Sequence, residues 1–375
     1  MSHIKLVANL VVIVVATTNM ILADDQSLVP PGAIARLEPL HTIAGDRMVS
    51  LALFADGKSI LWKNRDYTLH HWNLSTATEV GQFCGDDWWS QDIPQHFSIF
   101  QLQDQHSLLH SAAHGLTMLD LRTGQERVVS ELARGKSSWI SADGKRIVTY
   151  AKQGSWSKRT ATATFTLWDL QRSEKIREFT HSFQDAPEKA GAGAQLAAVS
   201  IAPNGKTIAT SWIYVGHGPM LTYRVGQVVC LWDVASGQKR QLDAAAAFHL
   251  HFLDMGQTLV CADGRNAGGA RSGEDRNHGL MEIWDVTAGH KLHKFESSVD
   301  WGGPIAFSPD GKSFASSGGL DDNAVYIWST ATGQQVQKFA GNPGGILCLT
   351  FSHDGSLLAS GSQDSILIWE TGALE

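Results

Sequence analysis

Few residue patterns in this sequence have the spacing that known chemistry requires. Gly-Lys-Ser or Gly-Lys-Thr triplets begin at Gly57, Gly205 and Gly311 and look like the end of a phosphate-binding loop, but each lacks the glycine five residues earlier. No serine occupies the G-x-S-x-G elbow of a hydrolase. The triplets therefore indicate turns, and we expect a non-catalytic protein without a cofactor.

Two histidines have the spacing of a metal-ligand pair. His249 and His251 are two residues apart, so in a strand both side chains point to the same face. Such a pair can hold part of a zinc site, but no third ligand is identifiable. Packing of the histidines between neighbouring sheets is the interpretation we favour, and no metal is expected.

The cysteines give no sign of a reactive or metal-binding motif. Four are present, far apart and without C-x-x-C spacing: Cys84, Cys230, Cys261 and Cys348. The last three fall inside strand patterns, where a buried thiol acts as a small apolar residue. A disulfide remains open as an alternative.

Residues 303–342 show the element on which the rest of the chain is built. This stretch contains four short runs rich in apolar, aromatic and β-branched residues, separated by three turns. The first turn, at residues 309–312, places Gly311 where a positive φ is needed. The pattern predicts a four-stranded antiparallel sheet. One such sheet cannot bury both of its faces, so units of this kind must stack.

Two signatures of this unit return along the chain. The turn between the first two strands recurs at residues 56–58, 143–145, 204–206, 255–257, 310–312 and 354–356. A degenerate copy lies at 105–107. The dipeptide that ends the third strand recurs at Trp72-Asn73, Leu119-Asp120, Trp168-Asp169, Trp232-Asp233, Trp284-Asp285, Trp328-Ser329 and Trp369-Glu370. Seven frames in order indicate a repeat protein.

The repeat resembles the WD40 family, through residues 307–312, Trp328 and Thr332-Gly333. The resemblance implies an all-β, seven-bladed β-propeller over residues 36–375, in which the third-strand Trp and Asp residues are structural. The chain also departs from the family. The Gly-His that usually precedes the first strand is replaced, as at Gly341-Asn342, so the hydrogen-bonded set of the family's blades is incomplete.

The two ends of the repeat region complement each other. Residues 42–45 match the ends of fourth strands at 82–85 and 338–341, so the region begins with a fourth strand that has no blade. The last blade, at 345–372, has only three strands. We therefore expect the N-terminal strand to pair with the C-terminal blade and close the ring, which removes two open sheet edges.

The first 23 residues do not follow the repeat. Lys5 precedes an apolar run at residues 6–16, and Ile21-Leu22-Ala23 is a typical cleavage site, so residues 1–23 indicate a secretory signal peptide. A retained anchor is the alternative, but the run is shorter than the about 20 residues that span a bilayer. Residues 24–35 are interpreted as a linker. We expect an exported protein, periplasmic or extracellular, that is free of the membrane after cleavage.

Blades three, four and five carry extra residues between the second and third strands. The surplus lies at residues 152–164, 212–226 and 264–279. In an up-and-down blade this connection opens on the same side as the connection between blades, so the three inserts are predicted to enlarge one face. Long loops in a compact domain are usually functional or disordered.

Aromatic and arginine residues are frequent on this predicted face, and such residues carry much of the energy of protein interfaces. The candidate binding residues are Trp88, Trp89, Trp156, Trp212, Tyr214, His217, Tyr223, Arg271 and Trp301. Two alternatives stay open: Trp212 can end the second strand inside the core, and the glycine-rich insert at 264–279 can be filler.

Two classes of function remain. A net charge of -7 and the lack of a basic patch disfavour nucleic acid as a partner. We favour a monomeric interaction scaffold that binds a protein partner through the face with the inserts. The alternative is a propeller enzyme, of hydrolase or redox type, with a site at the mouth of the channel, but no such site is visible in the sequence.

Overall fold

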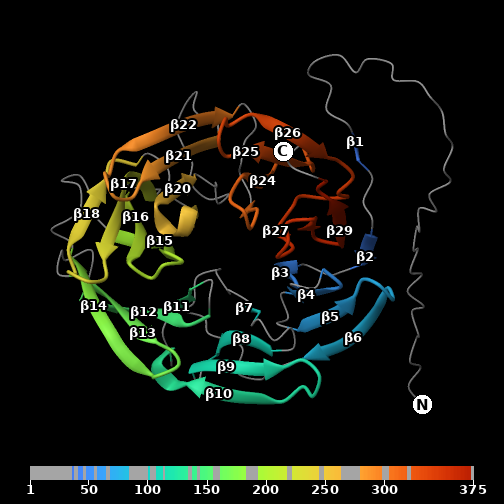
Figure 1. Cartoon of the computed structure of the whole chain (residues 1–375), viewed down its shortest axis with the longest axis horizontal. Helices are drawn as coiled ribbons and strands as arrows, with labels where there is room; N and C mark the ends of the chain where they lie inside the picture. Colours follow the sequence, from blue (N-terminus) through green and yellow to red (C-terminus); the bar gives the residue numbers. More distant parts are fainter. Residues whose placement is uncertain are drawn as a thin grey trace.

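Seven β-sheets stand around a central axis and form a closed ring (Figure 1). The computed structural model describes residues 36–37, 41–44, 48–54, 57–64, 68–83, 100–101, 107–112, 115–133, 137–141, 144–154, 161–182, 193–217, 222–244, 249–262, 279–297, 304–318 and 322–372. The predicted all-β, seven-bladed propeller is confirmed.

The first four blades follow each other along the chain. Blade one contains β3 (Met48–Leu53), β4 (Ser59–Asn64), β5 (Leu69–Asn73) and β6 (Thr78–Phe83). Blade two contains β7 (Phe100–Gln101), β8 (Ser107–Ala112), β9 (Gly115–Asp120) and β10 (Glu126–Ser130). Blade three contains β11 (Ser137–Ile140), β12 (Arg146–Gln153), β13 (Thr162–Asp169) and β14 (Glu174–Ser182). Blade four contains β15 (Gly193–Ile201), β16 (Thr207–His217), β17 (Thr222–Asp233) and β18 (Lys239–Leu242).

Blades five to seven complete the ring. Blade five contains β19 (His249–Leu253), β20 (Thr258–Ala262), β21 (Gly279–Asp285) and β22 (Lys291–Ser297). Blade six contains β23 (Ile305–Phe307), β24 (Ser313–Ser317), β25 (Val325–Ser329) and β26 (Gln335–Phe339). Blade seven contains β27 (Cys348–Phe351), β28 (Leu357–Gly361) and β29 (Ser365–Glu370). Two short 3-10 turns, η1 (Glu131–Ala133) and η3 (Asp254–Gly256), follow β10 and β19.

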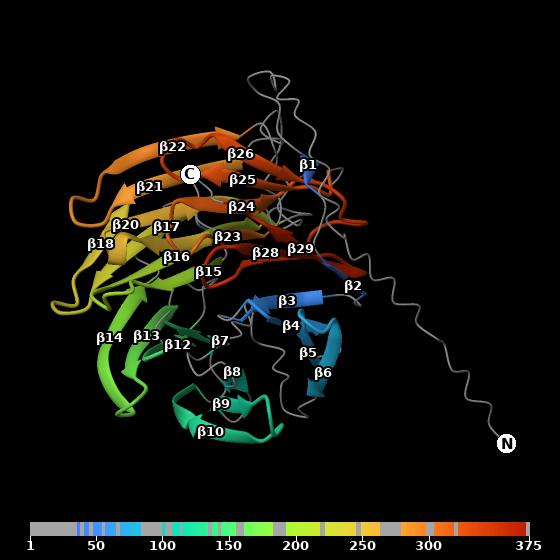
Figure 2. The same cartoon turned by 45° about the vertical axis from the view of Figure 1, so that its right-hand side comes forward.

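The N-terminal strand closes the ring, as the sequence predicts. β2 (His41–Ala44) pairs antiparallel with β29 and becomes the fourth strand of blade seven, with Ile43 opposite Ile366 (Figure 2). A feature that the sequence did not predict lies just before it. β1 (Arg36–Leu37) pairs in parallel with β26 and adds a fifth strand to the outer edge of blade six.

In six blades of the described structure, a backbone hydrogen bond joins the two turns on one face of the ring. The backbone N–H that begins the turn after the third strand donates to a carbonyl of the turn between the first two strands. Leu74 bonds to Lys58 in this way at 2.7 Å, and Val234 bonds to Lys206 at 2.8 Å. Gly311 has φ 71°, the positive value that its turn predicts. The repeated turn signatures therefore gather on the face opposite the inserts.

Apolar side chains fill the space between neighbouring blades. The largest cluster joins blades three and four through residues such as Phe165, Phe179 and Trp232. The third-strand aromatic residues therefore belong to the packing between blades. Within the described ranges, no helix has the length and apolar character needed to cross a membrane.

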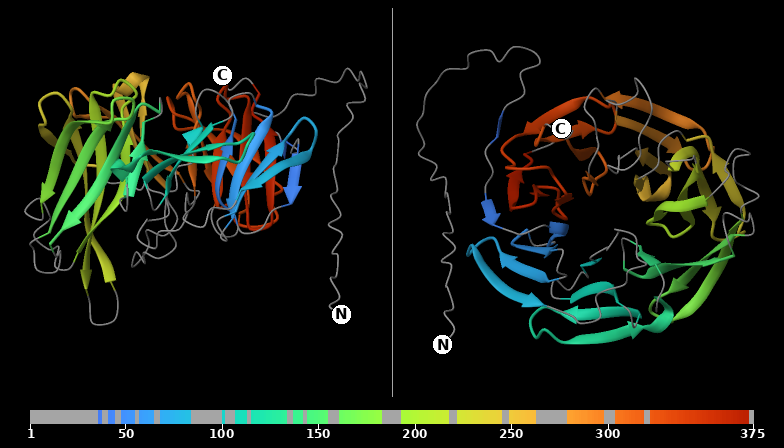
Figure 3. Two further views of the ribbon diagram at one scale, coloured as in Figure 1. Left: turned by 90° about the horizontal axis from the view of Figure 1, so that it is seen from below. Right: turned by 180° about the vertical axis from the view of Figure 1, so that it is seen from behind.

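The surplus residues of blades three and four prove to be mainly strand. β12 ends at Gln153 and β13 begins at Thr162, so both ends of the insert predicted at 152–164 continue the sheet, and residues 155–160 lie outside the described ranges. β16 and β17 are longer still, with 11 and 12 residues, and their hairpin projects beyond the other blades (Figure 3). We call residues 213–226 the blade-four arm. The insert of blade five lies almost wholly outside the described residues.

Candidate functional site

The repeated Trp-Asp positions act inside the blades. In four blades the indole N–H donates to a hydroxyl oxygen of the second strand: Trp168 to Thr149, Trp232 to Thr210, Trp328 to Ser316 and Trp369 to Ser360, at 2.9–3.0 Å. The carboxylates accept backbone N–H groups of the next turn: Asp169 from Arg172, Asp233 from Ser236 and Asp285 from Ala288. The hydrogen bonds from Ser236 also lower the pKa of Asp233. These groups shape turns and sheets.

Blade seven extends this bond by one further residue. The Ser360 hydroxyl accepts the indole N–H of Trp369 and donates to Oδ1 of Asn342 at 2.9 Å. Asn342 is buried and occupies the place where the sequence lacks the family's histidine. The Asn342 amide oxygen is therefore the acceptor for the Ser360 hydroxyl in this blade.

In blade five, a carboxylate takes the place of the hydroxyl group beside the indole N–H. Cys261 stands at the hydroxyl position, and the indole N–H of Trp284 points to Glu282 Oε2 at 3.4 Å. The fully buried Glu282 pairs with Lys291 at 2.6 Å, whose ammonium lies 5.1 Å from the centre of the Trp284 ring. Burial and the Glu282 carboxylate raise the pKa of Cys261, so this cysteine is a protonated thiol and a poor nucleophile.

Trp212 and Tyr214 do not present their side chains to a partner. Both are 0 % exposed, in the core between blades three and four. His181 of β14 stacks on Trp212 with ring centroids 4.4 Å apart, and its Nε2 lies 2.8 Å from the Tyr214 hydroxyl oxygen. The expectation that these two residues offer binding surface is therefore corrected: they anchor the base of the blade-four arm, which agrees with the alternative left open for Trp212.

The other candidate binding residues fall into two groups. His217 and Tyr223 belong to the strands of the arm, where Gly216 pairs with Tyr223 and His217 with Thr222. The remaining candidates lie outside the described residues: Trp88, Trp89, Trp156, Arg271 and Trp301. Of the candidate binding residues, the structure therefore places His217 and Tyr223 in the paired strands of the blade-four arm.

In the histidine pair of blade five, His251 packs against the next blade. His251 stacks on Phe307 of blade six, with ring centroids 4.4 Å apart and planes 4° from parallel. Burial lowers the pKa of His251 to about 4, so the ring is neutral at physiological pH. Among the described residues, no group of three or more His, Cys, Asp or Glu side chains is arranged to hold a metal ion.

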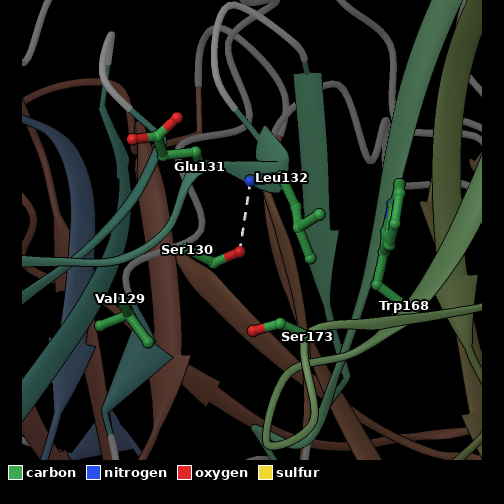
Figure 4. Close-up of a pocket in the computed structure, with 6 residues that line it drawn as sticks. All are labelled: Val129, Ser130, Glu131, Leu132, Trp168 and Ser173. Carbon is green, nitrogen blue, oxygen red and sulfur yellow. Dashed lines mark hydrogen bonds between the residues drawn. The ribbon is translucent and has the colours of Figure 1, made fainter.

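A hollow of about 490 Å³ opens between blades two and three (Figure 4). It is lined by Val129, Ser130, Glu131, Leu132, Trp168 and Ser173. The Ser130 hydroxyl oxygen accepts the backbone N–H of Leu132 at 3.2 Å. The indole N–H of Trp168 is directed to Thr149, so the ring itself contributes apolar surface to the hollow.

Sequence reasoning missed this hollow, although a signal for it exists. Ser130 follows Leu119 by eleven residues, the spacing that separates Phe83 from Trp72 in blade one. A small polar residue at a position that carries a large apolar one elsewhere predicts a gap in packing. The signal needs the repeats to be aligned by their third strands, and blade two lacks the Trp that marks that point.

Comparison with known proteins supports the repeat assignment. Residues 297–329 and 333–370 match the family model described as "WD domain, G-beta repeat". The chain is 29% identical over 218 residues to a guanine nucleotide-binding protein subunit beta of Arabidopsis thaliana, covering 56% of this chain and 51% of that protein. It is 40% identical over 67 residues, 18% of this chain and 8% of the other, to a periodic tryptophan protein 2 homolog of Schizosaccharomyces pombe.

A solved structure supports the architecture. The Cps50 (Swd1) β-propeller domain of Myceliophteria thermophila superposes with a TM-score of 0.59 at 15% identity, covering 89% of this chain and 99% of that one. The chain spans about half the length, or less, of the curated relatives it matches. The closed ring of seven sheets and the two matched repeats show that the chain is a seven-bladed β-propeller that contains repeats of the WD40 type.

Proposed function

We propose that the protein is a non-catalytic interaction scaffold that binds a protein partner through the face carrying the inserts of blades three to five. Propellers of this family typically act as scaffolds for other proteins, and function must be argued from a site and not from the fold alone. The observation that carries the proposal is the pairing of β16 with β17 out to His217 and Thr222, because it extends blade four beyond the other blades on this face.

The composition of the arm suits a protein partner. Its tip sequence, residues 216–223, includes Met220, Leu221 and Tyr223, which are apolar and aromatic residue types. Tyrosine and methionine are enriched at protein interfaces. The base of the arm is fixed by Trp212 and Tyr214 in the core, so the two strands that carry the tip are already positioned before a partner binds.

The test removes the tip and keeps the base. Val215 and Arg224 are register partners, so replacing residues 216–223 by Asn-Gly joins them through a two-residue hairpin turn. We expect the melting temperature to stay within about 2 °C of the parent, because no described core residue is lost. Partner capture from the native extracytoplasmic fraction, quantified by mass spectrometry, should fall at least tenfold.

A matched change on the opposite face controls for general surface effects. Lys206 is exposed in a turn between the first two strands of blade four, and Lys206→Ala should leave capture unchanged. If the arm-trimmed protein folds and captures the same partner as well as the parent does, the binding face lies elsewhere on the ring.

We further propose that the chain acts as a monomer outside the cytoplasm after cleavage near Asp24. The support is the charge, apolar run and cleavage pattern of residues 1–23. The intact mass of the protein recovered from the extracytoplasmic fraction tests this proposal. Membrane-bound protein that retains residues 1–23 would contradict it.

A further inference from the structure

One position of the outermost strand recurs at the junctions between blades. It pairs with the residue three positions before the end-of-strand Trp or Leu: Phe83 with Leu69, Phe179 with Phe165, Leu242 with Val229, Phe295 with Met281, Phe339 with Val325 and Ile43 with Ile366. All six residues are large and apolar. Phe179 lies 5.7 Å from the ring of Trp232 in the next blade, and Phe339 lies 5.0 Å from Trp369.

Blade two places a serine at this position. Ser130 pairs with Leu116, which stands three residues before Leu119, and the next blade presents Trp168. The hollow of about 490 Å³ lies at this junction, between Ser130 and Trp168 (Figure 4). Its volume falls in the range of about 300–1,000 Å³ that ligand sites occupy. The small side chain of Ser130 therefore contributes to an open hollow between these two blades.

The molecule itself shows how the outer edge of a blade receives another segment. β1 adds in parallel to β26, and Leu37 stands opposite Phe339, the counterpart of Ser130 in blade six. In the described part of the chain, β10 is the outermost strand of its sheet, and Val128 on it is 50 % exposed. β10 and β26 are thus both outermost strands of four-stranded blades, but β10 has its register shift beside Ser130, next to the hollow, whereas β26 pairs regularly where β1 joins it.

We propose that an extended segment of a partner protein pairs in parallel with β10, as β1 pairs with β26, and places an aromatic side chain in the hollow beside Trp168. Paired residues of neighbouring strands point to the same face, so the residue opposite Ser130 faces blade three. It starts from a strand about 4.8 Å farther out, and only a long side chain reaches Trp168 from there. Backbone hydrogen bonds supply affinity and the hollow supplies selectivity.

This site lies between blades two and three and shares no residue with the predicted inserts. The segment that binds there is extended and carries one aromatic residue. An aromatic ring that packs on Trp gains more binding free energy than the burial of its surface alone provides. The hollow and the insert face are therefore tested separately, by variants that leave the other surface unchanged.

The probe is a phage-displayed library of random octapeptides selected on the folded protein. Selected peptides should share one aromatic residue, and replacing it by alanine should weaken binding at least tenfold. Ser130→Phe fills the hollow, so it should raise the melting temperature and weaken the same peptides at least tenfold. Ser130→Leu is a smaller replacement that tests the same point if the phenylalanine does not fit.

Two controls locate the peptides on the molecule. Thr180→Phe adds the same ring to the exposed surface of the outermost strand of blade three, and peptide binding should persist. The arm-trimmed protein should also retain it. The proposal is overturned if no peptide is enriched, if the peptides bind the Ser130 variants as tightly as the parent, or if trimming the arm removes their binding.

Discussion

At the scale of single residues, the second-strand hydroxyl group decides whether the third-strand indole N–H has a hydrogen-bond acceptor inside its blade. Ser316 and Ser360 are 0 % exposed, so water does not replace a lost bond at either position. A buried donor left without its acceptor costs about 1–3 kcal/mol. Blade five shows the alternative, since Cys261 stands at the hydroxyl position and the buried Glu282, paired with Lys291, lies beside the indole.

Ser360→Ala should lower the free energy of unfolding by about 1–3 kcal/mol, because the indole N–H of Trp369 and the Asn342 amide oxygen both lose their partner. Urea unfolding followed by fluorescence measures the change. Ser356→Ala, in an exposed turn of the same blade, should change stability much less. Equal losses in the two variants would contradict the internal role of Ser360.

His251 should make stability depend on pH. Burial lowers its pKa from 6.5 to about 4, so between these values the unfolded chain binds a proton that the folded chain does not. Its contribution to stability is therefore complete above pH 6.5 and declines as the pH falls. Between pH 7.5 and pH 5 the parent should lose about 2 kcal/mol through this residue.

His251→Phe preserves a ring that can stack on Phe307, and it should remove that part of the pH dependence. Urea unfolding at the two pH values measures the difference. Replacing exposed His290 by phenylalanine serves as the control. A parent and a His251 variant with the same slope would show that His251 gains water and its proton in the folded state.

The residue identities that mark turns and third strands could be predicted from the sequence, because each reflects a local requirement. The surroundings of Trp212 and Tyr214 could not. An aromatic residue after a strand pattern is compatible with a loop tip and with a longer strand, and only the pairing with β17 decides between them. His181 approaches these rings from another blade, at a sequence distance that no local pattern reports.

At the scale of elements, several outermost strands contain a β-bulge within an otherwise regular antiparallel pairing. In four blades the strand bulges opposite the third-strand Trp, and the unpaired residue is an exposed aliphatic one: Val80, Ile176, Leu292 and Val336. Bulges twist an edge and limit its pairing with other chains. Blade two has its register shift between Val128 and Ser130, nearer the end of the strand, which leaves the edge at β10 different from the others.

Gly333→Ala should be strongly destabilising. Gly333 has φ 68°, and an added Cβ would lie 1.9 Å from Cδ1 of Phe295 in the neighbouring blade. Left-handed strain and overpacking together should cost more than about 2 kcal/mol. Gly345 has no heavy atom within 4 Å of such a Cβ, and Gly345→Ala should be nearly neutral. Thermal unfolding of both variants tests the pair, and similar melting temperatures would contradict the expected contact.

The strands themselves were largely predictable, since alternating apolar residues and turn glycines follow the period of the sheet. Their lengths in blades three and four were not. Residues 162–164 and 213–217 continue the sheets as strand, although sequence length alone is equally compatible with a loop. The hollow beside Trp168 was missed for a related reason, because Leu119 replaces the Trp by which the blades are aligned.

At the scale of the whole molecule, ring closure rests on β2. Ile43 is 3 % exposed and packs with residues of blades one and seven, so the short N-terminal strand joins the two ends of the ring. The closure was predictable because the repeat region begins with a fourth strand that has no blade, and its last blade has only three strands. The fifth strand β1 was not, since two residues carry no pattern.

Deleting residues 1–44 should cost more than about 4 kcal/mol, because it uncovers β29 and the cluster around Ile43. Deleting residues 1–40 keeps β2 and should cost much less. Denaturant unfolding measures stability, and light scattering detects association through the newly open edge. Equal stability of the two truncated proteins would show that β2 does not close the ring.

The pairing of β2 with β29 also fixes the order in which the molecule is completed. Ile43 and Ile366 are about 320 residues apart in the chain, so the ring cannot close until nearly all of the chain has been made. At a synthesis rate of about 5–20 residues per second, the N-terminal strand waits for tens of seconds. Before closure, any blades that have formed make up an open array with two uncovered edges. Closure is thus a late, long-range step of folding, and a protein caught before it is the form most exposed to misassembly with another copy.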